Sequence, residues 1–183
     1  AFDLLQLGLL CACSSTVLSS FIHVPLEDST LLGAPLVVGS ALDSTLAARC
    51  EDLSRAVERL KLIDSHDALI LLRSSFSAPK IQHLLRCSPC VGHKSLETYD
   101  EMLKTGISLI TNTELSETQW LQASLPVKDG GLGVRRATSL ALPSFLASAS
   151  STSALQRQIL QDCNFVSGSS IEGTYRDLWS HLY

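Results

Sequence analysis

The chain has 183 residues, a formal net charge of -4 at pH 7 and a pI near 5.7. This length suits one compact domain and excludes two full domains of ordinary size. The acidic balance argues against a free-standing nucleic-acid-binding protein, whose affinity would come largely from Lys and Arg. Residues 1–40 contain no Lys or Arg, so any basic surface must be local.

The composition favours helices over sheets. Apolar residues make up 45% of the chain and aromatic residues only 5%. Leu is the commonest apolar residue and β-branched residues rarely alternate with polar ones, which is typical of packed helices. We therefore expect a mainly α protein, an irregular bundle of about six to seven helices. A short strand or two is expected near residues 20–38, where prolines and a glycine favour extended or turn structure.

Six Cys are present, and the sequence carries no convincing secretion signal. The stretch Leu4–Cys13 resembles a short signal core, but no positive charge precedes it. No apolar run reaches the roughly 18 to 20 residues needed to span a bilayer. We therefore expect reduced thiols, no membrane partner and an intracellular protein, nuclear or cytoplasmic and not secreted.

The first predicted helix covers residues 42–63. Apolar residues recur there at intervals of three or four and form one stripe: Leu42, Leu46, Cys50, Leu53, Val57, Leu60 and Ile63. The residues between them are mostly charged, as on a solvent-exposed helix face. A second helix is expected after a cap at Asp64 or Ser65, with residues 68–72 buried on all sides.

Further helices follow at shorter intervals. Ser77–Pro79 interrupts the pattern, and a short helix is predicted over Lys80–Arg86. Ser95 opens a helix with one apolar face made by Leu96, Tyr99, Leu103, Ile107 and Ile110. Ser116 with Gln119 three residues later predicts a capping box before Trp120.

The last third begins with a glycine-rich turn over Asp129–Gly133, in which Gly130, Gly131 and Gly133 are structural. A helix is predicted from about residue 135 to 149, followed by a hinge at the Ser-rich run 148–153. An amphipathic piece at 154–163 and a short helix at 171–183 complete the chain. The final helix is expected to carry three aromatic anchors, which are Tyr175, Trp179 and Tyr183.

The acidic residues do not predict a catalytic centre. Two-metal nucleotide transfer needs closely placed aspartates, and no Asp-Asp pair occurs in the sequence. The acidic neighbours Glu27–Asp28, Glu51–Asp52 and Asp100–Glu101 are expected to be solvated surface residues. No G-x-S-x-G motif supports a hydrolase. We therefore predict no catalytic residue and no enzyme activity for the chain in isolation.

Four side chains have a spacing close to that of a zinc site. Cys87 and Cys90 form a C-x-x-C flanked by His83 and His93. Zinc binds four such groups in a tetrahedron, but the His spacing differs from that of common zinc fingers. A small buried cysteine at a helix end is the simpler interpretation of Cys87. We expect no metal, and a small zinc protein stays an alternative.

Several segments together resemble one family, the region carboxy-terminal to the palm in reverse transcriptases of non-LTR-type retroelements and their degenerate copies. They occur in the family's order and cover roughly residues 30–148. The matching segments are Thr30–Leu36, Leu42–Ile63, His66–Arg73, Pro79–Pro89, Trp120–Pro126, Gly130–Arg136 and Phe145–Ala147. The fingers, most of the palm, the catalytic Asp-Asp hairpin and a downstream zinc knuckle are absent from the sequence.

The resemblance implies a helical thumb and connector at residues 30–150, between an unmatched, poorly ordered or extended segment 1–29 and a helical tail 151–183. In such enzymes, which use Mg²⁺, the thumb grips the backbones of an RNA or DNA primer-template without reading sequence. It suggests the following backbone contacts: Arg49, Arg55, Arg59, Lys61 and Arg73 in the thumb, and Lys128, Arg135 and Arg136 in the connector. The alternative is a helical protein-interaction module with no nucleic-acid role.

Overall fold

The structure is a computed structural model that describes residues 24–159 and 171–182. A 3-10 turn η1 (Leu26–Asp28) and an antiparallel hairpin of β1 (Thr30–Leu31) and β2 (Ala34–Pro35) precede the helices. The helices are α2 (Ser40–Leu60), α3 (Ser65–Leu71), α4 (Ala78–Cys87), α5 (Lys94–Thr111), α6 (Glu117–Ala123), α7 (Ala137–Ile159) and α8 (Ile171–Leu182). The predicted mainly α fold with two short strands is confirmed. Residues 1–23, 160–170 and 183 lie outside the description.

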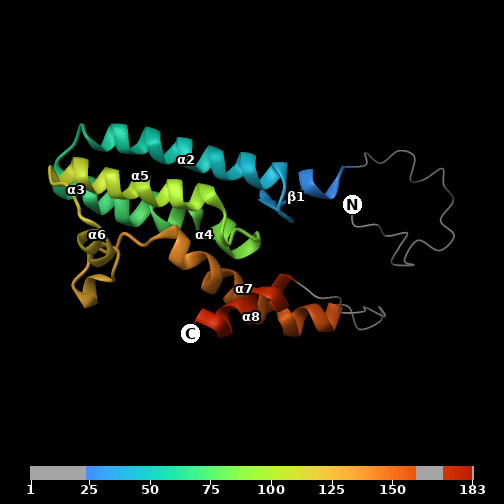
Figure 1. Cartoon of the computed structure of the whole chain (residues 1–183). Coiled ribbons are helices and arrows are strands. Elements are labelled where there is room, and N and C mark those ends of the chain that lie inside the picture. The colour runs from blue at the N-terminus through green and yellow to red at the C-terminus, as the bar shows by residue number, and fades with distance from the viewer. Residues whose placement is uncertain (1–23, 160–170, 183) are drawn as a thin grey trace, which may run out of the picture.

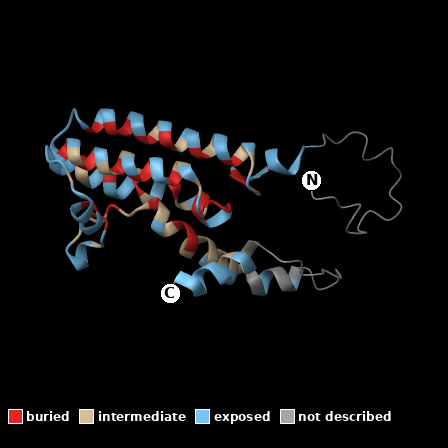
Figure 2. Ribbon diagram, viewed as in Figure 1, coloured by how far each residue is buried: buried red, intermediate tan, exposed pale blue. Residues whose placement is uncertain are grey.

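The long helices α2 and α5 lie side by side and run in the same direction (Figure 1). Between them and α7 runs a third rod, made of α3, the π-helical segment η2 (Leu72–Phe76) and α4, which points the opposite way. α7 packs on α4 and α5, and α8 folds back onto α7. Figure 2 shows buried residues on the facing sides of these helices and exposed residues on their outer sides.

The apolar stripe predicted for the first helix is confirmed from Leu42 to Leu60, all of whose members are buried. The stripe does not extend to Ile63, because α2 ends at Leu60 and Ile63 is 45% exposed in the following loop. The stripe of α5 is confirmed in full, with Tyr99, Leu103 and Ile107 almost inaccessible to solvent. These two faces supply most of the core between the long helices.

The prediction that residues 68–72 are buried on all sides is wrong. Ala68 and Leu72 have no exposed surface, but Ile70 is 43% and Leu71 40% exposed. The physical reason is that α3 lies at the edge of the bundle and presents only one face to α5. Apolar side chains on its outer face are left uncovered within the described part of the chain.

The predicted break at Ser77–Pro79 is narrower than expected. Only Ser77 departs from helical geometry, and α4 begins at Ala78, because proline is tolerated in the first turn of a helix. Before Ser77 the chain widens into the π-helical η2, in which the N–H of Ser77 bonds to the carbonyl of Leu72 at 2.8 Å. Such single-turn π segments are frequent at functional sites.

The glycine-rich turn is confirmed. Gly130 and Gly133 have φ values of 82° and 76°, which L-residues with a side chain rarely adopt. The capping box of Ser116 and Gln119 on α6 is also confirmed. η3 (Val127–Asp129) joins α6 to this turn.

The predicted hinge at 148–153 is wrong, because α7 continues through it to Ile159. The hydroxyls of Ser151 and Thr152 donate to the carbonyl of Ser148 inside the helix, at 2.8 and 3.2 Å. These side chains therefore bond within the helix and do not end it. α7 also begins at Ala137, two residues later than predicted. The predicted amphipathic piece at 154–163 belongs to α7 as far as Ile159, and its residues 160–163 fall outside the described residues.

The last predicted helix is present as α8. Tyr175 stacks edge-on against Phe145 of α7, with ring centroids 5.2 Å apart, and therefore anchors α8 to α7. Trp179 is 37% exposed, and Tyr183 lies outside the described residues. None of the described helices has both the length and the apolar character needed to cross a membrane.

Candidate nucleic-acid interface

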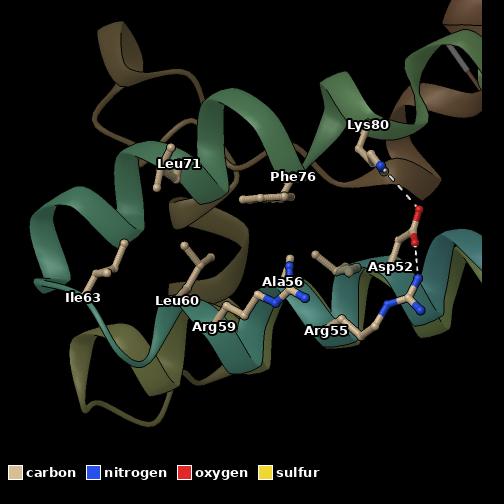
Figure 3. A pocket seen from close by; sticks show the side chains of 10 residues that line it. Asp52, Arg55, Ala56, Arg59, Leu60, Ile63, Leu71, Phe76 and Lys80 are labelled. Carbon is tan, nitrogen blue, oxygen red and sulfur yellow. Dashed lines mark hydrogen bonds and ion pairs between the residues drawn. The ribbon is translucent and has the colours of Figure 1, made fainter.

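A groove of about 570 Å³ runs between α2 and the α3–η2–α4 rod (Figure 3). We call it the α2 groove. Its lining comprises Asp52, Leu53, Arg55, Ala56, Arg59 and Leu60 of α2, then Ile63, Leu71, Phe76 and Lys80. Figure 3 shows Asp52, Arg55 and Lys80 at one end and Leu60, Ile63 and Leu71 at the other, with the Phe76 ring and Arg59 between them. The groove therefore has an ionic end and an apolar end.

The ionic end is organised around one carboxylate. Asp52 lies 3.4 Å from a guanidinium nitrogen of Arg49, 2.5 Å from one of Arg55 and 3.3 Å from the Nζ of Lys80. Hydrogen bonds from Arg55 and Lys80 hold the pKa of Asp52 below its ordinary value. The ion pair between Asp52 and Lys80 connects α2 with α4 and closes this end of the groove.

Two of the basic residues predicted on α2, Arg49 and Arg55, therefore converge on Asp52. Lys80 of α4 joins them, although it was not among the predicted residues. Arg59 also lines the groove, is exposed, and has no ion pair within the described part of the chain. Lys61 pairs instead with Glu58 at 2.6 Å and does not line the groove. The spacing of Arg55 and Arg59, four residues apart, predicts one helix face, but the approach of Lys80 depends on tertiary packing.

A buried tyrosine of α5 holds the backbone of Phe76. The hydroxyl of Tyr99 lies 2.7 Å from the carbonyl oxygen of Phe76 and 3.2 Å from that of Ser77, and donates to them. Burial raises the pKa of Tyr99, so the hydroxyl stays protonated and remains a donor. Tyr99 itself is 1% exposed. The backbone of Phe76 is thus fixed from the core side while its ring borders the groove.

The remaining predicted basic residues lie elsewhere. Arg73 lines a second cavity of about 190 Å³ between α3 and the glycine turn, together with His66, Ile70, Val127 and Gly131 among others. A methyl group added to Gly133 would lie 2.9 Å from Cδ of Arg73, so the arginine stem packs directly over this glycine. The structure distributes the predicted residues over several places and does not bring them together at one.

The connector residues differ in exposure. Lys128 is exposed in η3, whereas Arg135 and Arg136 are half-buried just before α7. The Nε of Arg136 is buried and has no hydrogen-bond acceptor within the described residues. Burial raises the pKa of Asp100, and the positive charge of Arg136 is among the effects that oppose this rise. The hydrogen bond from Lys104 lowers the pKa of Glu117, and Arg136 adds to that lowering. Arg136 therefore faces acidic residues of the chain itself.

The expectation that Asp100 is a solvated surface residue is wrong. Asp100 is only 5% exposed and accepts hydrogen bonds from the first residues of α7. Sequence reasoning missed this role, although an acidic residue next to the apolar stripe of a helix is a usable signal for a buried carboxylate. Asp100 and Asp52 lie on different helices, and each has its own basic or N–H partners.

The four zinc candidates have different surroundings. The Nδ1 of His83 lies 3.7 Å from the Sγ of Cys87 on α4. Cys90 is buried, with its thiol 3.7 Å from the carbonyl of Leu84, and burial raises its pKa to about 12. His93 bonds to Asp43 through Nε2 at 2.8 Å and caps α5 through Nδ1. The structure brings His83 and Cys87 together, but not all four.

The described residues contain no group of three His, Cys, Asp or Glu side chains placed to hold a metal ion. What the α2 groove offers chemically is a pair of arginines and a lysine beside an open aromatic ring, an arrangement suited to binding an anion that has an apolar part. Comparison of the chain with protein-family models, with curated proteins and with solved structures found no match in any of the three.

Proposed function

We propose that this chain is the helical region that follows the polymerase core of a non-LTR-type reverse transcriptase. In this proposal it holds the backbone of a primer-template through the α2 groove and has no polymerase activity of its own. The ordered resemblance over residues 30–148 supports the origin. Such a fragment acts in the nucleus or the cytoplasm, where its RNA or DNA partner is found.

The observation that carries the proposal is the grouping of Arg55, Arg59 and Lys80 along one groove. Phosphate contacts orient a nucleic acid without reading its sequence, and Arg and Lys are the usual donors. The chain as a whole is acidic, so attraction depends on this local cluster. Asp52 neutralises part of it, so the expected affinity is modest and sensitive to salt.

Fluorescence anisotropy with a labelled RNA–DNA primer-template hybrid at low salt tests this function. We expect Arg59→Gln to weaken binding severalfold, because Arg59 is the groove arginine without an ion pair among the described residues. Arg176→Gln is the matched control, since it removes the same charge from α8, where Arg176 pairs with Glu172. Equal affinities of the two variants, or no binding by the unmodified chain, would reject the proposal.

A primer-extension assay tests the second half of the proposal. The sequence has no Asp-Asp pair to hold two magnesium ions, and two-metal transfer needs such carboxylates. We expect no templated synthesis from the purified chain with Mg²⁺ and nucleoside triphosphates. Nucleotide incorporation that depends on the template would contradict this expectation.

One observation favours a second candidate, a helical protein-interaction module. Large apolar side chains are exposed around α3: Leu62 is 84%, Ile70 43% and Leu71 40% exposed. Neighbouring exposed apolar residues often mark protein contacts. In this case the chain should self-associate or bind another protein. Removal of a charge from the α2 groove should not change that association. Sedimentation analysis of the wild type and Leu62→Ser, with the anisotropy measurement above, separates the two candidates.

A further inference from the structure

The α2 groove has more apolar lining than contact with phosphates alone requires. Leu53, Ala56, Leu60, Ile63, Leu71 and Phe76 make up more than half of the residues around it. A backbone phosphate makes no favourable contact with such a surface, because apolar surface contributes to binding when another apolar surface covers it. A ligand that fills the groove therefore has an anionic part and an apolar, flat or compact part.

The position of Phe76 suggests what the apolar part is. Its ring lies between the ionic and the aliphatic ends (Figure 3), and it is only partly buried against the core. Unpaired nucleobases stack on aromatic side chains, and this contact tolerates any base because every base has a flat π-face. Tyr99 fixes the backbone of Phe76, so the ring is held in place before a ligand arrives.

The size and shape of the groove favour a nucleotide over a helical peptide. Its volume of about 570 Å³ lies within the ~300–1,000 Å³ of small-ligand sites. An amphipathic helix laid into a groove must continue past both ends of its contact surface. The ion pair of Asp52 with Lys80 closes the ionic end, so the groove can take in one unstacked nucleotide of a strand while the rest of the strand passes outside the groove.

We propose, on the basis of the proposed function, that the α2 groove binds one unstacked nucleotide of a nucleic-acid strand. The base lies against Phe76 and the aliphatic end. The phosphate lies between Arg55 and Lys80, where it takes the place of the Asp52 carboxylate. Asp52 is thus an internal anion that keeps the basic side chains in position until a phosphate displaces it.

The base contact is tested by measuring the affinity of the wild type and of two variants for two different strands. The probes are a short single-stranded oligothymidylate and a strand of the same length and charge with abasic sites in place of the bases. We expect removal of the bases to weaken binding to the wild type about tenfold. Phe76→Leu keeps an apolar side chain but removes the aromatic face, so this variant should lose most of the difference in affinity between the two strands. Phe145→Leu, on α7, is the control for loss of an aromatic ring outside the groove.

A second variant tests the displacement of Asp52. Asp52→Asn removes the competing negative charge and should bind both strands severalfold more tightly than the wild type. Unchanged or weaker binding by Asp52→Asn would contradict the displacement. Equal affinity of the wild type for both strands would reject the base contact. If Arg59→Gln still weakened binding of the primer-template in that case, the proposed contact with the nucleic-acid backbone would remain supported.

The competing occupant, an acidic amphipathic helix, is tested with a designed peptide of Leu at positions i, i+3, i+4 and i+7 and Glu elsewhere. We expect this peptide not to displace the oligothymidylate. If the peptide binds, if Phe76→Leu abolishes that binding and if neither strand binds, both the nucleotide site and the nucleic-acid function are wrong.

Discussion

The carboxylate of Asp100 on α5 accepts a hydrogen bond of 2.6 Å from the backbone N–H of Ala137, the first residue of α7. It also accepts from the N–H of Thr138 at 3.1 Å and from its hydroxyl at 2.5 Å. The first N–H groups of a helix have no partner within the helix. A side chain from a neighbouring helix therefore performs the role that an N-cap residue usually performs, and it fixes where α7 begins.

Asp100→Ala should lower the free energy of unfolding by about 1–3 kcal/mol, because buried N–H groups lose their acceptor. Glu101→Ala is the matched control, since Glu101 is the exposed neighbour on the same helix. Urea unfolding of both variants followed by circular dichroism measures the difference. Equal stabilities would show that the contact does not hold α7.

Asp100 also makes the unfolding free energy depend on pH, and the shift of its pKa determines the direction. Burial raises the pKa of Asp100 above its ordinary value, although hydrogen bonds from Thr138 and Ala137 oppose the rise. The folded chain therefore binds more protons than the unfolded chain between the two pKa values, and the unfolding free energy falls as the pH rises through that window. The window begins near the ordinary Asp value of about 4 and extends upward.

Asp100→Asn has no proton to lose in this window. The stability of the wild type relative to this variant should be greater at about pH 3 than at about pH 7. Denaturant unfolding of both proteins at the two pH values measures the change, and the other titrating groups cancel in the comparison. A relative stability that increases with pH would contradict the account.

The hairpin before α2 has a strained turn. Leu32 has a φ of 52° and is 89% exposed, and Gly33 follows with a φ of 79°. A two-residue turn with both φ values positive favours Asn followed by Gly. Leu32→Asn should therefore raise the unfolding free energy by about 0.5–1 kcal/mol. Leu31→Asn, in the adjacent strand and also exposed, should not stabilise the chain; a gain there equal to that at Leu32 would argue against relief of strain.

Two neighbouring glycines in the turn before α7 should differ in their tolerance of a methyl group. A Cβ on Gly131 would lie 2.1 Å from the carbonyl oxygen of Leu125, whereas one on Gly130 would meet nothing within 4 Å. Gly131→Ala should cost well above about 2 kcal/mol through displaced backbone. Gly130→Ala should cost about 1 kcal/mol through its positive φ alone. Thermal unfolding of both variants measures the order, and the reverse order would be inconsistent with this packing.

Features that repeat within one segment were predictable from the sequence. The stripe of α2, the stripe of α5 and the capping box at Ser116 depend on residues three or four positions apart, and the structure contains all three. The glycine turn was predictable because glycine adopts positive φ more readily than other residues. Gly130 and Gly133 do so in the structure. Local chemistry determines these features.

Features that join distant segments were not predictable. Lys80 reaches Asp52 across the groove, and Tyr99 reaches Phe76 through the core. Nothing in the spacing of these residues indicates such contacts, because they depend on how whole helices pack. The error at the Ser-rich run has a local cause: Ser and Thr hydroxyls can bond to a helix carbonyl as readily as they can end a helix.

The salt dependence of nucleic-acid binding tests the central claim most directly. Each phosphate contact with a duplex adds about -0.9 to the slope of log association constant against log salt concentration. The account predicts binding of an RNA–DNA hybrid whose slope becomes shallower by roughly two to three when Arg55, Arg59 and Lys80 are all replaced by Gln. An unchanged slope and affinity in that triple variant would contradict the claim that the α2 groove holds the nucleic-acid backbone.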